Sequence, residues 1–226
     1  KDGESIDHPW INKALERAQQ KVEARNFDIR KTLIKFDNVL NDQRQVIFSQ
    51  RKEAMNSEKI FDYSNNFLDE IKKDIINSKI QKSANPKSSY FESQIRTLMG
   101  KNFDEKNLEI LLKKKDDELI KLISDRFNES REERIKLLGL EQSKQIEKRI
   151  FLQSIDINWK SHIQYLEQLR QVIGLRSYGQ RDPLVEYKKE AFSLFEDLLK
   201  KLKRDYINIL MNLKFVQTSS TKPDKD

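Results

Sequence analysis

The stretch Leu175–Phe192, which reads LRSYGQRDPLVEYKKEAF, decides the fold because it separates two long helical patterns. Asp182 is a natural N-cap residue, and Pro183 suits the first turn of the next helix, where its missing N–H costs no hydrogen bond. Gly174 and Gly179 lie close to the break and relax the restrictions on the backbone. A connection this short makes the flanking helices antiparallel neighbours, so the sequence predicts a helical hairpin with this stretch at its tip.

Two apolar stripes support the hairpin, because residues at alternating spacings of three and four share one face of a helix. The first stripe comprises Ile155, Trp159, His162, Leu166, Leu169 and Ile173, and the second comprises Ala191, Phe195, Leu198, Leu202, Asp205, Ile209, Leu213 and Val216. We interpret His162 as a core or half-buried histidine held by a neighbour such as Asp205 or a backbone carbonyl, in preference to a ligand or a switch. Trp159 is interpreted as a packing anchor.

The composition indicates helices with a large solvated surface and a thin core. Of the 226 residues, 36% are apolar and 36% are charged, and the chain has five glycines, four prolines and no cysteine. Neither glycine nor proline occurs between Trp10 and Asn85, which favours helix. The pattern over residues 8–57 predicts one helix roughly 70 Å long, which must act as a strut because no small domain can bury it.

The predicted fold class is all-α, with one very long helix, a small helical insertion and a long antiparallel two-helix hairpin. We divide the chain into a lead-in over residues 1–7, the long helix over 8–57, the insertion over 58–140, the hairpin with its returning helix over 141–216, and a disordered polar tail over 217–226.

The net charge of +7 leaves two interpretations open. One is an acidic partner, either nucleic acid or an anionic membrane surface, and the other is lysine placed on every solvated helix face. Interleaved acids and bases favour the second. The basic runs 113–115 and 200–204 could contact anionic lipid headgroups. We expect no nucleic-acid partner, because aromatic residues are not interleaved with these runs as a stacking platform requires.

The sequence contains no motif for catalysis or for metal binding. A nucleotide-binding loop needs clustered glycines before a helix and a Lys-Ser/Thr pair, and zinc sites need closely spaced His and Cys. The only histidines are His8 and His162, and no serine–histidine constellation accompanies them. No apolar run has membrane-spanning length, and no signal peptide is apparent. We therefore expect no catalytic residue, metal site or cofactor here, and a cytoplasmic or peripheral protein.

Two tracts resemble the SecA family, the ATPase motors of bacterial preprotein export. Elements similar to the family's long scaffold helix are His8-Pro9, Ala18-Gln19, Lys21-Val22-Glu23, Asn26–Lys31, Asp37-Asn38-Val39 and Asn41–Arg44. Elements similar to its two-helix finger are Leu152-Gln153, Asp156, Trp159-Lys160, His162, Tyr165-Leu166, Leu169-Arg170-Gln171 and the tip. Residues 61–140 add little to the resemblance, so their identity as the family's helical wing depends on position alone.

The resemblance implies a non-catalytic C-terminal fragment of such a motor, with the nucleotide-binding domains, ATP and Mg²⁺ upstream of it. ATP turnover there would shift the scaffold helix, and the finger would pass that shift to an unfolded preprotein entering the SecYEG channel. This work would take place in the cytoplasm, at the inner face of the bacterial plasma membrane. The preprotein or channel contact is expected at Arg176, Tyr178, Gln180 and Arg181, and the motor-domain docking face at Arg30, Asp37, Asn41, Asp42 and Arg44.

Plainer interpretations remain open for both sets of residues. The Tyr178 side chain would fold back over its own turn, and the scaffold residues would form i,i+4 pairs along an exposed face, worth a few tenths of a kcal/mol each. The rival for the whole chain is a structural helical or coiled-coil interaction module without a transport role. A simple spacer, however, has no need of Arg176, Tyr178 and Arg181 together.

Overall fold

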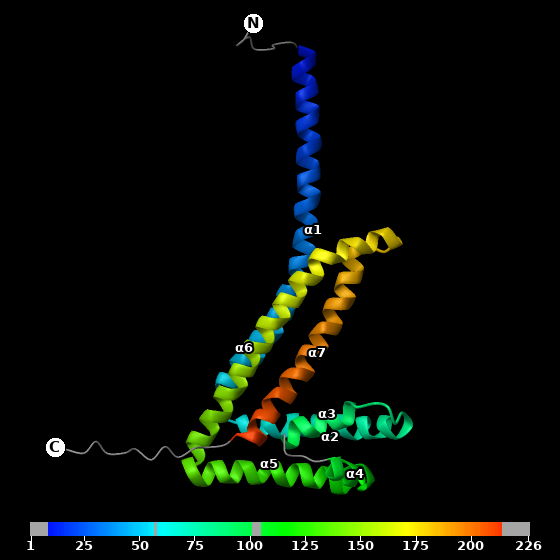
Figure 1. Ribbon diagram of the computed structural model, residues 1–226. Helices are drawn as coiled ribbons and strands as arrows, with labels where there is room; N and C mark the ends of the chain where they lie inside the picture. Colours follow the sequence, from blue (N-terminus) through cyan, green and yellow to red (C-terminus); the bar gives the residue numbers. More distant parts are fainter. Residues whose placement is uncertain (1–8, 57, 101–104, 214–226) are drawn as a thin grey trace, which may run out of the picture. The chain divides into compact units, whose positions relative to one another are not determined.

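The computed structural model describes residues 9–56, 58–100 and 105–213, and all regular structure in these ranges is helical, which confirms the predicted all-α class (Figure 1). The elements are α1 (Pro9–Asn56), α2 (Ile60–Ala84), α3 (Tyr90–Met99), α4 (Glu105–Lys113), α5 (Asp116–Leu138), α6 (Leu140–Val172), the 3-10 helix η1 (Ile173–Gly179) and α7 (Pro183–Asn212). None of these helices has the length and apolar character needed to cross a bilayer. The predicted lead-in, His8 and the predicted tail lie outside the described residues.

The chain folds into two compact units, each assembled from separate segments. Of the described residues, unit 1 contains 9–48 and 161–196, and unit 2 contains 49–56, 58–100, 105–160 and 197–213. Helices α1, α6 and α7 therefore contribute to both units, whereas α2, α3, α4 and α5 belong to unit 2 alone. The division into five segments stays a prediction, because these units group the residues by contact and not by position in the chain.

In unit 1, α1 is solvated over most of its length and packed only near its end. Every residue from Pro9 to Lys35 is exposed, and burial begins with Phe36. The core consists of buried Leu166, Ile173, Tyr187 and Ala191, against which Phe36, Val39, Leu40, Leu169 and Leu194 pack. The ring of Phe36 meets the ring of Tyr187 edge-on at a centroid distance of 4.8 Å. The long helix thus uses one short apolar stretch to hold the hairpin.

The hairpin helices in unit 1 run in opposite directions. The rings of His162 and Phe195 lie 5.8 Å apart, and nearer the tip Arg176 is paired with Glu190. As the residue number rises in one arm, the partner's number falls in the other. Figure 1 shows the same path, with α6 and η1 leading into a turn that returns as α7.

In unit 2, an aromatic cluster joins three helices. Phe67 of α2, Phe151 of α6 and Tyr206 of α7 have centroid distances of 5.1 to 6.1 Å. Burial is nearly complete for Phe151 and Tyr206. Buried residues of α3 and α5 extend this core: Phe91, Ile95, Leu98, Leu119, Ile123 and Phe127.

The predicted apolar stripe of α7 is right in its first half and wrong near the end of the helix. Ala191, Phe195, Leu198 and Leu202 are buried, but Ile209 is 43% exposed. The buried residues that follow Leu202 are Tyr206, Ile207, Leu210 and Met211. The stripe changes because other helices of unit 2 contact this part of α7: α3 bonds to Arg204 and Asn212, and α5 bonds to the Leu210 carbonyl. Val216 lies outside the described residues.

Candidate functional site

At the tip of the hairpin, α7 begins with the predicted N-cap residue, Asp182. Oδ1 of Asp182 accepts hydrogen bonds from the backbone N–H of Leu184 at 2.8 Å and of Val185 at 3.4 Å. These bonds satisfy donors of the first turn that have no partner within the helix. The left-handed backbone position of the turn belongs to Gln180, with φ of 57°, whereas neither Gly174 nor Gly179 has a positive φ. The turn needs only one such residue, and η1 winds the rest of the chain tightly.

The side chain of Tyr178 projects from this turn with 88% of its surface exposed. The plainer interpretation, in which the ring folds back over the turn, is therefore wrong. Gln180 is also exposed, and Leu175 adds an apolar side chain that is 66% exposed. The tip therefore presents an aromatic ring, a hydroxyl and a neighbouring aliphatic group to a partner. Because these groups are already exposed, no rearrangement of the chain is needed before they can bind.

Both arginines of the tip are held by carboxylates of α7. Nη2 of Arg176 donates to Oε1 of Glu190 at 2.9 Å, and Nη1 of Arg181 donates to Oε2 of Glu186 at 3.2 Å. Such exposed pairs contribute at most about 1 kcal/mol to stability, so their main effect is to orient the guanidinium groups. Desolvation raises the pKa of Glu186, but the hydrogen bond from Arg181 and the charges of Lys189 and Arg181 outweigh it and lower that pKa.

Only four of the five residues predicted to form the docking face lie on the same side of the long helix. At 100° per residue, Arg30, Asp37, Asn41 and Arg44 lie within about 60° of one another, whereas Asp42 lies about 140° from Asp37. All five side chains are exposed. Oδ1 of Asp37 accepts a hydrogen bond from Nη1 of Arg170 on α6 at 3.0 Å. Asp37 therefore connects α1 to the hairpin within unit 1, and the structure gives the other four residues no such partner on the hairpin.

A buried polar bridge joins all three helices of unit 1. Nε2 of His162 on α6 lies 2.7 Å from Oε1 of Gln43 on α1. Nε2 of Gln43 donates to the backbone carbonyl of Ala191 on α7 at 3.0 Å. Because the carbonyl can only accept, the amide of Gln43 must direct its oxygen at His162, and Nε2 of His162 must donate the proton.

The environment of His162 keeps the imidazole neutral. The side chain is 3% exposed, and this burial lowers the pKa of His162 to about 4. The expected burial is confirmed, but Nε2 of His162 bonds to Gln43 and not to the suggested partner Asp205, whose carboxylate accepts from Nδ2 of Asn158 at 3.1 Å. Gln43 itself was not predicted. Its position in the series Phe36, Leu40, Gln43 and Ile47 is the signal that could have revealed it, since this spacing follows the buried face of α1.

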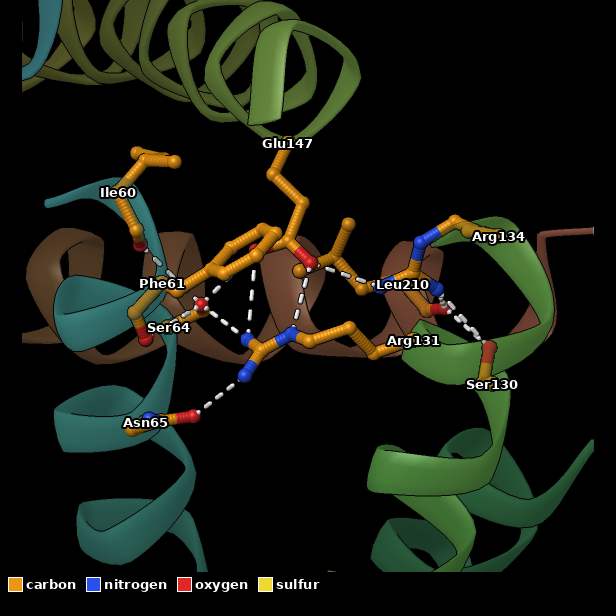
Figure 2. A network of polar contacts seen from close by, with 9 residues as sticks. All are labelled: Ile60, Phe61, Ser64, Asn65, Ser130, Arg131, Arg134, Glu147 and Leu210. Carbon is orange, nitrogen blue, oxygen red and sulfur yellow. Dashed lines mark hydrogen bonds and ion pairs between the residues drawn. The ribbon is translucent and has the colours of Figure 1, made fainter. Parts of the chain in front are cut away.

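Unit 2 contains a second polar network, centred on Glu147 of α6 (Figure 2). Oε1 of Glu147 accepts from Nη2 of Arg134 at 2.8 Å and from Nε of Arg131 at 3.1 Å, both from α5. Its Oε2 accepts from the hydroxyl of Ser64 on α2 at 2.9 Å. Arg134 also donates to the backbone carbonyl of Leu210 on α7 at 2.7 Å. Three helices therefore meet at one carboxylate, and Arg134 extends the network to α7.

Burial makes this network energetically important. Glu147 is completely buried and Arg134 is 1% exposed. The guanidinium of Arg131 lies between the rings of Phe61 and Phe127, 4.5 and 4.6 Å from their centroids. Burial and the negative charge of Glu147 raise the pKa of the nearby Tyr206 hydroxyl. The buried carboxylate is tolerated because two arginines and one hydroxyl donate to it, although Nε of Arg134 has no hydrogen-bond partner among the described residues. The network fixes how the helices pack.

The described residues offer no metal-binding group of three or more His, Cys, Asp or Glu side chains. A family profile described as the SecA Wing and Scaffold domain matches residues 5–214. The chain belongs to the SecA family. It is 67% identical, over 97% of its length, to the protein translocase subunit SecA of Pelagibacter ubique, and 42% identical, over its whole length, to that of Bartonella bacilliformis. It spans 26% and 25% of those relatives, about a quarter of each.

The two tracts that resemble the SecA family are widely separated in the sequence, yet both belong to the one region that the SecA profile matches. The match covers the long helix, the insertion and the hairpin as one region, including residues 61–140, where no motif was apparent. For the candidate site, the fold pairs Asp37 with Arg170 and Gln43 with His162 in unit 1. It leaves Arg176, Tyr178, Gln180 and Arg181 exposed at the tip.

Proposed function

We propose that this chain is a force-transmitting segment of a protein translocase subunit, without catalytic residues of its own. In this proposal, ATP hydrolysis in nucleotide-binding domains outside the chain moves the long helix, and the hairpin passes the movement to an unfolded preprotein at the SecYEG channel. The observation that carries the proposal is Tyr178, which is 88% exposed at the end of a capped hairpin. The names of the relatives, each a protein translocase subunit, support it.

The tip has the chemistry that contact with passing polypeptides requires. A tyrosine binds through a large apolar surface and one hydroxyl while losing little side-chain entropy, so it suits partners of varied sequence. Arg176 and Arg181 flank Tyr178 in the sequence and are held by Glu190 and Glu186. Their oriented guanidinium groups can donate to the backbone carbonyls of an extended chain without a large ordering cost.

The connections within unit 1 suit the transmission of movement. The Arg170–Asp37 pair lies at the surface, and the bridge from His162 through Gln43 to the Ala191 carbonyl is buried. A displacement of α1 along or across its axis would have to break these bonds or move the hairpin with it. Arg30, Asn41, Asp42 and Arg44 stay exposed for docking to the nucleotide-binding domains.

The remaining parts of the proposal concern what lies outside the chain. ATP and Mg²⁺ would bind in the nucleotide-binding domains, because the described residues contain neither a phosphate-binding loop nor a group of acidic ligands for the ion. The protein would work in the cytoplasm at the inner face of the bacterial plasma membrane. Anionic lipid near the basic runs is a further partner in this view, and nucleic acid is not.

The test is Tyr178→Ala in the full-length translocase subunit. We expect preprotein transport to fall severalfold while the melting temperature stays within about 1 °C, since an exposed side chain adds little to stability. Tyr165→Ala is the matched control, because Tyr165 is 60% exposed on α6 of the same hairpin but away from the tip. Unchanged transport by Tyr178→Ala would favour the rival, a structural interaction module.

A further inference from the structure

A pocket of about 250 Å³ lies in unit 2 between α2, α3 and the end of α7. Its apolar part consists of Ile71, Ile75 and Leu98, which are 5%, 1% and 2% exposed. The proposed function uses none of these residues. The volume is sufficient for one branched aliphatic side chain and the polar groups attached to it.

Two cross-links between α3 and α7 define the ends of the pocket. Nη1 of Arg204 donates to the hydroxyl of Tyr90 at 2.8 Å, and Nδ2 of Asn212 donates to the carbonyl of Leu98 at 3.3 Å. Tyr90 and Leu98 are eight residues apart on α3, and Arg204 and Asn212 are eight residues apart on α7, so two bonds separated by roughly 12 Å along each helix link α3 to α7. The walls of the pocket are therefore held at both ends.

Gln94 lines the middle of this pocket and is unusual in its bonding. Its Oε1 atom is enclosed by the protein and has no hydrogen-bond partner among the described residues. A buried acceptor without a partner is unfavourable. Because Gln94 also lines the pocket, a rotation of its side-chain amide would bring Oε1 to the pocket wall, where an N–H group of a ligand can donate to it.

The rim of the pocket carries donors for an anion. Lys201 and Arg204 are cationic, and the Tyr90 hydroxyl, which accepts the bond from Arg204, can donate its own hydrogen onward. Asp205 is the only acidic residue of the lining, and Asn158 already bonds to its carboxylate. The electrostatic balance at the rim is therefore positive.

We propose that this pocket binds a hydrophobic α-carboxylate that carries an acylated N–H, as in an N-acyl amino acid or the C-terminal residue of a peptide. The aliphatic side chain would lie on Ile71, Ile75 and Leu98, the carboxylate would bind Arg204, Lys201 and Tyr90, and the N–H would donate to Gln94. Tyr90 and Gln94 are one helical turn apart, about 6 Å, which suits a carboxylate and its adjacent N–H. This proposal does not depend on the translocation role.

The test is a titration of the 226-residue chain with N-acetyl-leucine, followed by ¹H–¹⁵N NMR. We expect saturable shifts at the residues of the pocket. N-acetyl-leucinamide, which lacks the charge, and octanoate, which lacks the N–H, should each bind about tenfold more weakly. Arg204→Gln and Gln94→Leu should weaken N-acetyl-leucine similarly. Lys200→Gln is the control, because this exposed lysine on α7 does not line the pocket.

A second arm distinguishes the two sources of the ligand. A tetrapeptide that ends in leucine with a free carboxylate should bind at least as tightly as N-acetyl-leucine if the natural ligand is a polypeptide C-terminus. Weaker binding by the peptide would assign a free N-acyl amino acid. Equal binding of the acid, the amide and octanoate would overturn the proposal, and so would shifts that persist unchanged in both Arg204→Gln and Gln94→Leu.

Discussion

Nη2 of Arg134 lies 2.8 Å from Oε1 of Glu147, and the two side chains are 1% and 0% exposed. This pair spans the corner at Gly139, where α5 ends and α6 begins. Because Arg134 also bonds to the Leu210 carbonyl and Glu147 to Ser64, the same pair reaches α7 and α2. A buried pair with so many partners stabilises little by its charge alone, but it makes any other packing of these helices costly.

Glu147→Gln should destabilise unit 2 by about 3–5 kcal/mol, because it leaves Arg131 and Arg134 without a compensating negative charge in the core. Urea unfolding followed by circular dichroism measures the change. Glu141→Gln is the control, since Glu141 is exposed on α6 and pairs only with Lys144 at i,i+3. A loss for Glu147→Gln no larger than for Glu141→Gln would contradict the importance of the network.

Protonation of His162 should destabilise the fold in acid. Burial lowers the pKa of His162 from 6.5 to about 4, so the unfolded chain binds a proton more readily between these values. The contribution is complete above about pH 6.5 and is lost as pH falls toward 4, by an amount on the order of 3 kcal/mol. The variant His162→Gln should lack this part of the pH dependence of unfolding.

Direct titration of the imidazole provides an independent measurement for His162. The chain has two histidines, so the NMR spectrum should contain two imidazole titrations, and His8→Gln identifies which belongs to His162. A midpoint near 6.5 for His162 would mean that the ring is not buried as the structure has it.

Gln43→Leu should cost about 1–3 kcal/mol despite the added apolar surface. The change leaves the N–H of His162 and the carbonyl of Ala191 without this bridging amide inside the packed part of unit 1. Gln45→Leu is the matched control, because Gln45 is exposed two residues along α1 and should change stability by less than about 0.5 kcal/mol. Equal effects of the two variants, measured by thermal unfolding, would argue against the bridge.

Two glycine substitutions should have opposite effects. Gly139 has φ of 84° and ψ of 163°, a region almost restricted to glycine, so Gly139→Ala should destabilise by about 1–3 kcal/mol although the site has space for the methyl group. Gly174 has no positive φ and similar space, so Gly174→Ala should be neutral or stabilise by up to about 1 kcal/mol. Differential scanning calorimetry of both variants compares them directly, and equal melting temperatures would be the contrary result.

Local signals predicted much of the fold. The absence of breakers indicated a helix over residues 8–57, and α1 spans Pro9–Asn56. The cap at Asp182 and the proline after it located the start of α7. These features depend on neighbours a few residues away, which is why the sequence reveals them. The apolar stripe of α7 was predicted correctly only where the helix faces a single hairpin arm.

The hydrogen-bond partners inside the protein were not predicted, for the opposite reason, although the burial of His162 was. Gln43 and His162 are 119 positions apart, and Ser64 and Glu147 are 83 apart. Arg131, Arg134 and Glu147 sit among other charged residues and resemble a solvated helix face. Nothing in their spacing distinguishes a carboxylate that faces water from one that faces two guanidinium groups.

The sequence by itself determined that this chain is helical, where its longest helix and its hairpin turn lie, and to which family it belongs. Helix formation, capping and turn geometry depend on residues close together in the chain, and the family resemblance depends only on which residues occur at which positions. Only the tertiary structure decided which polar groups are buried, which face of α7 is covered and that Gln94 borders a pocket. Burial depends on what stands opposite a side chain, and that is settled by distant segments when the helices pack.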